Sequence, residues 1–115
     1  MKTKTKENPE THELFEFINK SLTKCAFITL IAKCRVICGK KTFKPRDRII
    51  MIKPDYSLIV DDVSKLEPLC SLPPESKFQT KIENKILIFK GFNENTRESM
   101  EIKIYKAHLA TYHKS

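Results

Sequence analysis

The chain has 115 residues, of which 22 are lysine or arginine and 14 are aspartate or glutamate, so its formal net charge is +8. This length suits one domain with one hydrophobic core, so we expect no second, catalytic domain within these residues. No apolar run reaches the roughly 20 residues of a membrane-spanning helix, and no signal peptide is evident, so we expect a soluble, cytoplasmic protein without a membrane partner.

The lysine-rich start, residues 1–7, is expected to be a disordered basic tail, which leaves a single domain at residues 8–115. An Asn-Pro pair at residues 8 and 9 is a helix-start signal with Asn8 as the N-cap. The apolar residues that follow recur at a spacing of four, which predicts a core-packing helix: Leu14, Ile18 and Leu22.

From Cys25 to Cys38 the apolar period changes to two, which predicts a long strand that bends and is solvated along half of one face. A turn at residues 39–40, a short strand at residues 41–43 and a second strand at residues 48–53 follow. The sequence Lys53-Pro54-Asp55-Tyr56 then predicts a hairpin turn into a strand that ends near Val60.

Prolines at positions 68, 73 and 74 cannot donate ladder hydrogen bonds, so residues 65–75 are expected to be a loop. Alternating patterns predict further strands at residues 77–82 and 85–90, and a last strand that starts near Met100 and runs to Ala110 or Tyr112. The expected fold is mostly β (α+β): one N-terminal helix followed by a strongly bent, half-closed, barrel-like antiparallel sheet of about seven strands.

Almost all of the excess charge lies in residues 33–53, which we call the basic stretch. It contains eight basic residues and a single acidic one, Asp47, while the rest of the chain carries 14 basic and 13 acidic residues. This stretch is either a solvated lysine-rich face or, because strands would hold its charges on a rigid surface, a binding site for a polyanion such as DNA. The predicted DNA contacts, of which Arg35, Lys41 and Arg48 are the best phosphate candidates, are Lys33, Arg35, Lys40, Lys41, Lys44, Arg46, Arg48 and Lys53.

The sequence predicts no catalytic residue, cofactor or metal site. The four cysteines, at positions 25, 34, 38 and 70, are expected to be reduced and to act as small buried hydrophobes. On one strand Cys34 and Cys38 would lie about 13 Å apart, too far to share a zinc ion, and only a turn at residues 36–38 would bring them together. Pro54-Asp55 with Glu83 or Glu101 imitates a nuclease metal site, but a hairpin turn explains it better.

Four motifs follow one another in a fixed order: Asp-Arg-Ile-Ile-Met-Ile-Lys-Pro-Asp at 47–55, Glu-Pro-Leu at 67–69, Pro-Pro at 73–74, and Met-Glu-Ile-Lys-Ile-Tyr at 100–105. In this order they resemble the N-terminal domain of the NucS family of mismatch-cutting DNA endonucleases, over roughly residues 9–112. The resemblance implies a half-closed barrel that forms a homodimer and binds DNA, while a RecB-like nuclease domain that follows it performs the cutting.

The chain departs from the pattern of this family at four places, one of which is Lys40-Lys41-Thr42, where the family has Gly-Arg-Ala. Ser71 stands where the family has a base-stacking tryptophan, Leu66 where it has a phosphate-pairing arginine, and Tyr56 where it has a turn glycine. Stacking on an aromatic side chain contributes about 1 to 3 kcal/mol per base, so we expect weaker single-strand binding unless Tyr56 or Phe43 supplies the stacking.

These observations predict a non-catalytic, homodimeric module that binds single-stranded or branched (junction) DNA mainly through phosphates, with little base specificity, and that accompanies a nuclease or other repair protein. The last strand could pack on the N-terminal helix or form the dimer seam, because an apolar strand at a sheet edge is a ready pairing surface. One alternative is an interaction module that has lost DNA binding and regulates a full-length nuclease through mixed dimers. Another is a fragment of a longer endonuclease.

Overall fold

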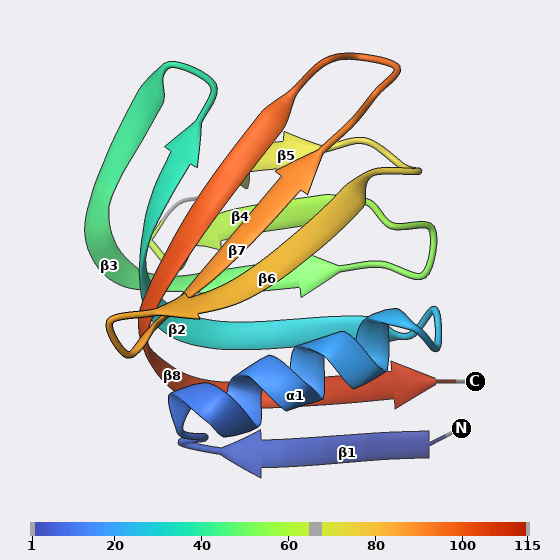
Figure 1. Cartoon of the computed structure of the whole chain (residues 1–115), viewed down its shortest axis with the longest axis vertical. Helices are drawn as coiled ribbons and strands as arrows, with labels where there is room; N and C mark the ends of the chain where they lie inside the picture. Colours follow the sequence, from blue (N-terminus) through green and yellow to red (C-terminus); the bar gives the residue numbers. More distant parts are fainter. Residues whose placement is uncertain (1, 65–67, 115) are drawn as a thin grey trace.

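The computed structural model describes residues 2–64 and 68–114. Within these residues the sheet has eight antiparallel strands, in the order β5-β4-β3-β2-β8-β7-β6, and β1 pairs with the C-terminal part of β8 (Figure 1). The elements are β1 (Lys2–Glu7), α1 (Thr11–Leu22), β2 (Phe27–Cys38), β3 (Lys41–Ile52), β4 (Leu58–Asp62), β5 (Pro68–Leu72), β6 (Lys77–Glu83), β7 (Ile86–Phe92) and β8 (Ser99–Lys114). The mostly β, half-closed architecture is therefore as predicted.

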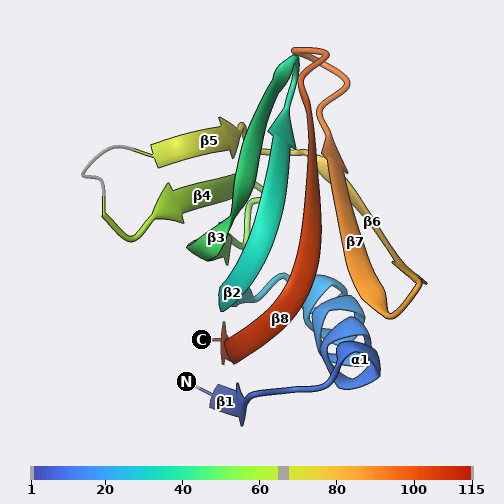
Figure 2. The ribbon, with the colours of Figure 1, turned by 90° about the vertical axis from the view of Figure 1, so that its left-hand side faces the viewer.

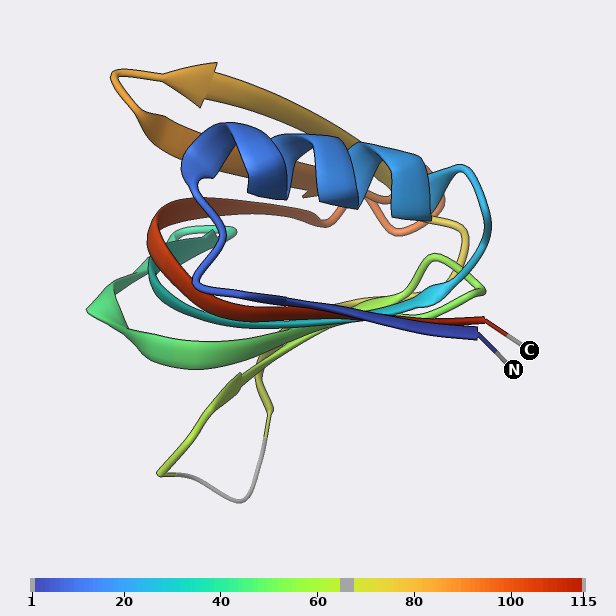
Figure 3. The same ribbon diagram turned by 90° about the horizontal axis from the view of Figure 1, so that it is seen from below.

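The sheet bends strongly, and α1 lies across its concave side, where it contacts β6, β7 and β8 (Figures 2 and 3). The apolar stripe of the helix enters the core, since Leu14 and Ile18 are almost completely buried. Full burial of such a side chain contributes about 1.5 to 3 kcal/mol, so the stripe holds the helix on the sheet.

The long strand β2 follows its predicted period of two. Its inner face, toward α1 and the core, is buried at every second residue: Ile28, Leu30, Ala32, Cys34 and Val36. Its outer face carries Ile31, Lys33 and Arg35, which are half-buried or exposed. Both basic side chains on β2, those of Lys33 and Arg35, therefore lie on the outer side of the sheet.

The β3–β4 turn also forms as predicted. The backbone N–H of Tyr56 donates to the carbonyl oxygen of Lys53 at 2.9 Å. The Asp55 carboxylate accepts hydrogen bonds from the backbone and side chain of Ser57, at 2.9 and 2.7 Å. Tyr56 has φ +62°, a left-handed conformation that favours glycine. The Asp55 carboxylate, which resembled a nuclease metal ligand in the sequence, thus stabilises the turn.

The helix begins later than predicted. Asn8 has φ +46°, and its backbone N–H donates to the carbonyl oxygen of His108 at 2.9 Å. The N-cap is Glu10, whose N–H donates to the Glu13 carboxylate at 3.2 Å. Asn8 therefore belongs to the connection between β1 and the helix and not to the helix start, because its backbone N–H is hydrogen-bonded to β8. The predicted helix end at Leu22 is correct.

Two strands were not predicted. Residues 2–7 pair with residues 109–114 of β8, so the expectation of a disordered tail is wrong for this part of the chain. Residues 68–72 form β5 beside β4, where a loop was expected. Pro68 is compatible with β5 because it is the first residue of an edge strand, where a missing N–H costs no ladder bond. Leu66 lies outside the described residues.

The strand β3 is continuous from Lys41 to Ile52, although two separate strands were expected. Pro45 fits because the register between β2 and β3 shifts between Cys34 and Val36, so Pro45 lies at an irregularity where no ladder bond is required. The strand thereby carries the whole second half of the basic stretch.

The expectation that all four cysteines are reduced is wrong for one pair. Cys38, at the end of β2, and Cys70, in β5, form a disulfide with a Cα–Cα distance of 6.5 Å. They are 32 residues apart, and only the folding of the sheet brings them together. Cys34 is free and buried as predicted, whereas Cys25 is free and exposed.

The last strand is not a free edge, so it cannot join two copies of the chain by edge-to-edge pairing. β8 pairs with β2 on one side and with β7 and then β1 on the other. Its backbone is thus satisfied on both sides, and Ala107 and Tyr112 are buried. Among residues 2–64 and 68–114, no helix is long and apolar enough to cross a membrane.

Candidate nucleic-acid interface

The β2–β3 hairpin displays most of the basic stretch. At its tip and along its strands the side chains of Lys33, Lys40, Lys41, Lys44 and Arg46 are exposed, and that of Arg35 is half-exposed. We call these six residues the hairpin cluster. The hairpin extends away from α1 and β1, to the far end of the molecule (Figure 1). The paired strands therefore present six cations on a framework whose backbone is ordered before any ligand binds.

Two lysines from β8 extend this surface. Arg35 is opposite Lys103 and Lys33 is opposite Lys106 in the β2–β8 register, and directly paired residues lie on the same face of a sheet. The sequence contained a signal, since Lys103 and Lys106 lie beside the apolar residues of the last strand. Their place next to the hairpin cluster could not be derived without the register.

Two acidic residues, Asp47 and Glu101, reduce the positive charge on this face. Asp47 is paired with Lys33 in the β2–β3 register, and its carboxylate lies 2.8 Å from the Nε2 of His108. Glu101 forms an ion pair with Lys90 at 3.8 Å. Both carboxylates thus have partners of their own, and the surface formed by the hairpin cluster with Lys103 and Lys106 remains positive.

Arg48 does not belong to this surface, so its prediction as a phosphate contact is wrong. Its side chain is only 2% exposed, and its Nη1 donates to the carbonyl oxygen of Cys34 at 2.6 Å. Its Nε has no hydrogen-bond partner within the described residues. Burial raises the pKa of the Cys34 thiol, and the nearby Arg48 charge opposes that rise. Arg48 is a cation of the interior.

Asp62 supplies negative charge near Arg48. It is opposite Arg48 in the β3–β4 register, and its carboxylate lies 3.9 Å from Nη1 of Arg46. Hydrogen bonds from the backbone and side chain of Ser64 hold the pKa of Asp62 below its usual value, and the charges of Arg48 and Arg46 act in the same direction. Asp62 thereby stabilises the buried arginine and takes up part of the charge of Arg46.

Tyr56 and Lys53 lie at the other end of β3, beside the turn. The hydroxyl of Tyr56 donates to the carbonyl oxygen of Leu22 at 2.7 Å and lies 3.2 Å from the Sγ of Cys25, so it fastens the end of α1. The Cys25 contact and partial burial raise the pKa of Tyr56. Its ring centroid is 6.4 Å from that of Phe78. The structure assigns this ring to packing and brings it to none of the hairpin residues.

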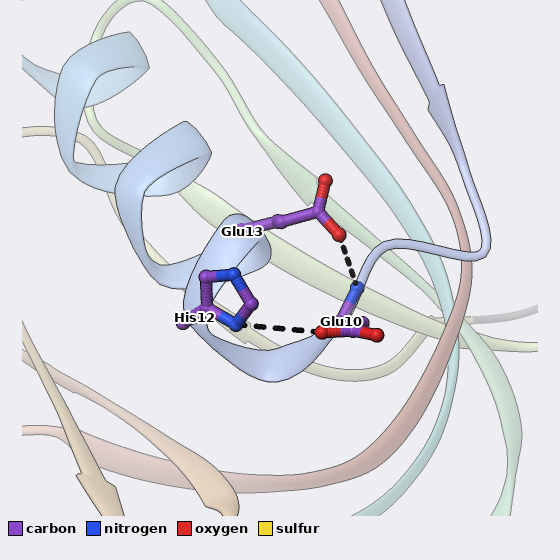
Figure 4. Close-up of side chains that lie close together, drawn as sticks. All are labelled: Glu10, His12 and Glu13. Atoms are coloured by element: carbon purple, nitrogen blue, oxygen red, sulfur yellow. Dashed lines mark hydrogen bonds and ion pairs between the residues drawn. The ribbon is translucent and has the colours of Figure 1, made fainter.

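Glu10, His12 and Glu13 form the one group of potential metal ligands within the described residues (Figure 4). The Glu13 carboxylate caps the N–H of Glu10 and lies 4.0 Å from the Nζ of Lys6, while Nδ1 of His12 lies 3.6 Å from a Glu10 oxygen. Glu10 and His12 are exposed. Helix capping and ion pairing explain this arrangement without a metal ion.

A family model described as the endonuclease NucS N-terminal PH-like domain matches residues 24–115. The endonuclease NucS of Thermococcus kodakarensis is 29% identical over 108 residues, which is 90% of this chain and 42% of that protein. The endonuclease NucS of Pyrococcus furiosus is 33% identical over 108 residues, which is 91% of this chain and 39% of that protein. The chain thus spans about two fifths of the length of these curated relatives.

Solved structures share the fold. A chain from the structure of EndoMS with double-stranded DNA superposes with a TM-score of 0.93 at 24% identity and covers 100% of this chain and 49% of that one. A repair endonuclease from Pyrococcus abyssi gives a TM-score of 0.82 at 28% identity, covering 96% of this chain and 49% of that one. Together with the family model, these likenesses place the chain in the endonuclease NucS family, where it matches the N-terminal PH-like domain.

Proposed function

We propose that this chain is a non-catalytic, DNA-binding module that contacts single-stranded or branched DNA mainly through phosphates, with the hairpin cluster as its contact surface. The hairpin cluster carries the proposal, because it joins six solvent-accessible cations on paired strands. Neutralising phosphates with such cations releases counterions, so binding would depend on salt and little on base sequence. The relatives that are named endonucleases support a nucleic-acid partner.

The test is fluorescence anisotropy of a labelled single strand and of its duplex, each titrated with the full chain at several salt concentrations. The triple variant Lys33→Glu, Arg35→Glu and Lys41→Glu should weaken binding and lower the slope of log K against log salt by about 2, which corresponds to three single-strand phosphate contacts. Lys77→Glu, Lys81→Glu and Lys85→Glu on the exposed β6–β7 hairpin reverse the same number of charges. Equal affinity for both triple variants would exclude the hairpin cluster as the contact surface.

The outer face of the sheet supports a homodimer and the second candidate function, a module that forms mixed dimers with a full-length nuclease. Ile31 is opposite Ile49 on β3 and Leu109 on β8, and Met51 is opposite Ile59 on β4. All five side chains are half-buried on the face away from α1. A contiguous apolar surface of this kind is typical of a subunit interface.

Sedimentation analysis separates this candidate from the first. Ile31→Glu with Leu109→Glu should dissociate a dimer formed through this face, whereas the hairpin triple variant should leave association intact. If the unmodified chain bound no nucleic acid and the outer-face variant lost association with a full-length NucS relative, the interaction module would be the better account. An unchanged sedimentation coefficient for the outer-face variant would exclude this face as the interface.

A further inference from the structure

A second basic surface lies at the other end of the molecule. β1 runs alongside α1 (Figure 3). Residues of both elements and Tyr112 of β8 line a groove with a volume of about 550 Å³. The hairpin cluster lies at the opposite end of the longest axis, along which the molecule extends 35 Å (Figure 1). The β1–α1 groove is thus separate from the surface proposed above.

One wall of the groove is a row of lysines on β1. Lys6 lies 4.0 Å from Glu13 of the helix, and Lys4 is opposite the buried Tyr112, so these lysines are on the helix side of the strand. Lys2 shares this side because side chains alternate along a strand. The three lysines recur about every 6.7 Å, at 3.3 to 3.4 Å per residue. The strand therefore offers evenly spaced, exposed cations.

The other wall is the C-terminal end of α1. Lys20, in the last turn of α1, and Lys24, which follows the helix, line the groove, and both are exposed. The Nζ of Lys24 lies 5.6 Å from the centre of the Tyr112 ring. Lys114 donates to the carbonyl oxygen of Lys24, which places a further cation beside this wall. Cations from three separate segments of the sequence thus converge here.

The acids that line the groove leave one end strongly positive. Glu13 is engaged by Lys6 and by the N–H of Glu10, and Glu16 lies one turn before Lys20. Among the described residues, no ion pair or side-chain hydrogen bond engages the amino groups of Lys4 and Lys20. The helix dipole accounts for a cation at the last turn, but it does not account for the facing row on β1.

The floor of the groove indicates which part of a ligand it would contact. Phe17 is 9% exposed and Tyr112 is 4% exposed, so neither ring is available for base stacking. The groove offers regularly spaced point charges, which suit a chain with one negative charge per repeating unit. We propose that the β1–α1 groove binds the phosphate backbone of a single-stranded nucleic acid, independently of the hairpin cluster.

The test uses the full chain carrying the hairpin triple variant, so that the groove is measured alone. The probe is a fluorescein-labelled oligothymidylate of about 10 nucleotides, within the site sizes of single-strand grooves. This background should retain salt-dependent binding. Adding Lys4→Glu and Lys20→Glu should weaken that binding about tenfold or more and lower the slope of log K against log salt by about 1.4, for two phosphates.

Two further variants test whether a loss of binding comes from misfolding or from a general change of charge. Glu16→Lys adds a cation to the groove and should tighten binding in the same background, which a misfolded protein would not do. Lys81→Glu with Lys85→Glu reverses two exposed charges on the β6–β7 hairpin and should leave the affinity unchanged. Circular dichroism melting curves establish that every variant is folded.

Three results would overturn the groove proposal: no binding by the hairpin triple variant, an unchanged affinity after Lys4→Glu and Lys20→Glu, or displacement of the oligonucleotide by polyglutamate at equal charge concentration. The last result would assign the groove to acidic protein segments. None of them decides the role of the hairpin cluster, because that role is measured by the loss of affinity between the unmodified chain and the hairpin triple variant.

Discussion

The basic residues in the two halves of the basic stretch differ in their exposure to solvent. At the hairpin end, Lys33 and Lys41 are exposed and available to a ligand, whereas toward the other end Arg48 is 2% exposed. Tyr56, three residues beyond the stretch, is hydrogen-bonded to the end of the helix. In the sequence both ends look alike, since each mixes basic residues with strand-forming ones. Burial, and not local charge, decides which cations can meet a phosphate.

The largest expected effect on the hairpin end comes from the Cys38–Cys70 disulfide. It closes a loop with a sequence separation of 32, and the chain-entropy model gives about 3 to 4 kcal/mol of stabilisation for such a loop. Cys70→Ser should lower the free energy of unfolding by this amount in oxidising buffer, measured by urea denaturation. Under reducing conditions the variant and the unmodified chain should converge. Cys25→Ser, which removes a free thiol, is the control, and equal effects of both variants would contradict the stated role of the disulfide.

Arg48→Ala should separate the two ends most clearly. This variant should lower the free energy of unfolding by about 1.5 to 3 kcal/mol, because it removes the hydrogen bond from the buried guanidinium to the carbonyl oxygen of Cys34. Lys33→Ala should change the free energy of unfolding by no more than about 0.5 kcal/mol, as expected for an exposed side chain. Chemical denaturation measures both. A small effect for Arg48→Ala would mean that this arginine is not part of the interior.

Tyr56→Phe tests the assignment of this tyrosine to packing. Loss of the hydrogen bond to Leu22 should lower the free energy of unfolding by about 0.5 to 1.5 kcal/mol, while the affinity for single-stranded DNA stays the same. Tyr105→Phe, at a side chain that is 38% exposed, is the matched control and should change neither quantity. A loss of DNA affinity without a loss of stability would restore Tyr56 to the contact surface.

The smallest expected effect is on acid stability. The pKa of Asp62 is lowered, chiefly by its hydrogen bonds from Ser64, so its contribution to stability is complete above the usual aspartate pKa of about 3.9. That contribution is lost as the pH falls through the lowered pKa. Asp62→Asn should therefore flatten the dependence of unfolding free energy on pH below about pH 4, whereas Asp61→Asn should preserve it. Identical pH profiles for both variants would refute the assignment.

The sequence predicted those parts of the fold that rest on local patterns. The alternation along β2 and the Pro-Asp turn after β3 define a strand and a hairpin without knowledge of their neighbours. β1 and β5 were missed because each depends on a partner strand far away in the sequence. A lysine-rich segment such as residues 2–7 is predicted to be disordered from its composition alone, and it forms a strand here because β8 provides backbone hydrogen-bond partners.

The candidate site was predicted in part, for the same reason. Charge density located the hairpin cluster, since its residues are close together in the sequence. It could not separate Arg48 from Arg35, and it could not find Lys103, which reaches the cluster through the register with β8. The β1–α1 groove was likewise hidden, because its lysines come from segments that are separate in the sequence and that only the fold brings together.

The most direct test of the central claim is a titration of the ¹⁵N-labelled full chain with an unlabelled single strand, followed by amide chemical shifts in NMR spectra. The account predicts salt-sensitive shifts at residues 33–46 of the hairpin, with Tyr56 and its neighbours in the β3–β4 turn unaffected. Shifts at the β3–β4 turn with an unperturbed hairpin would contradict it, since the contact would then lie away from the hairpin cluster.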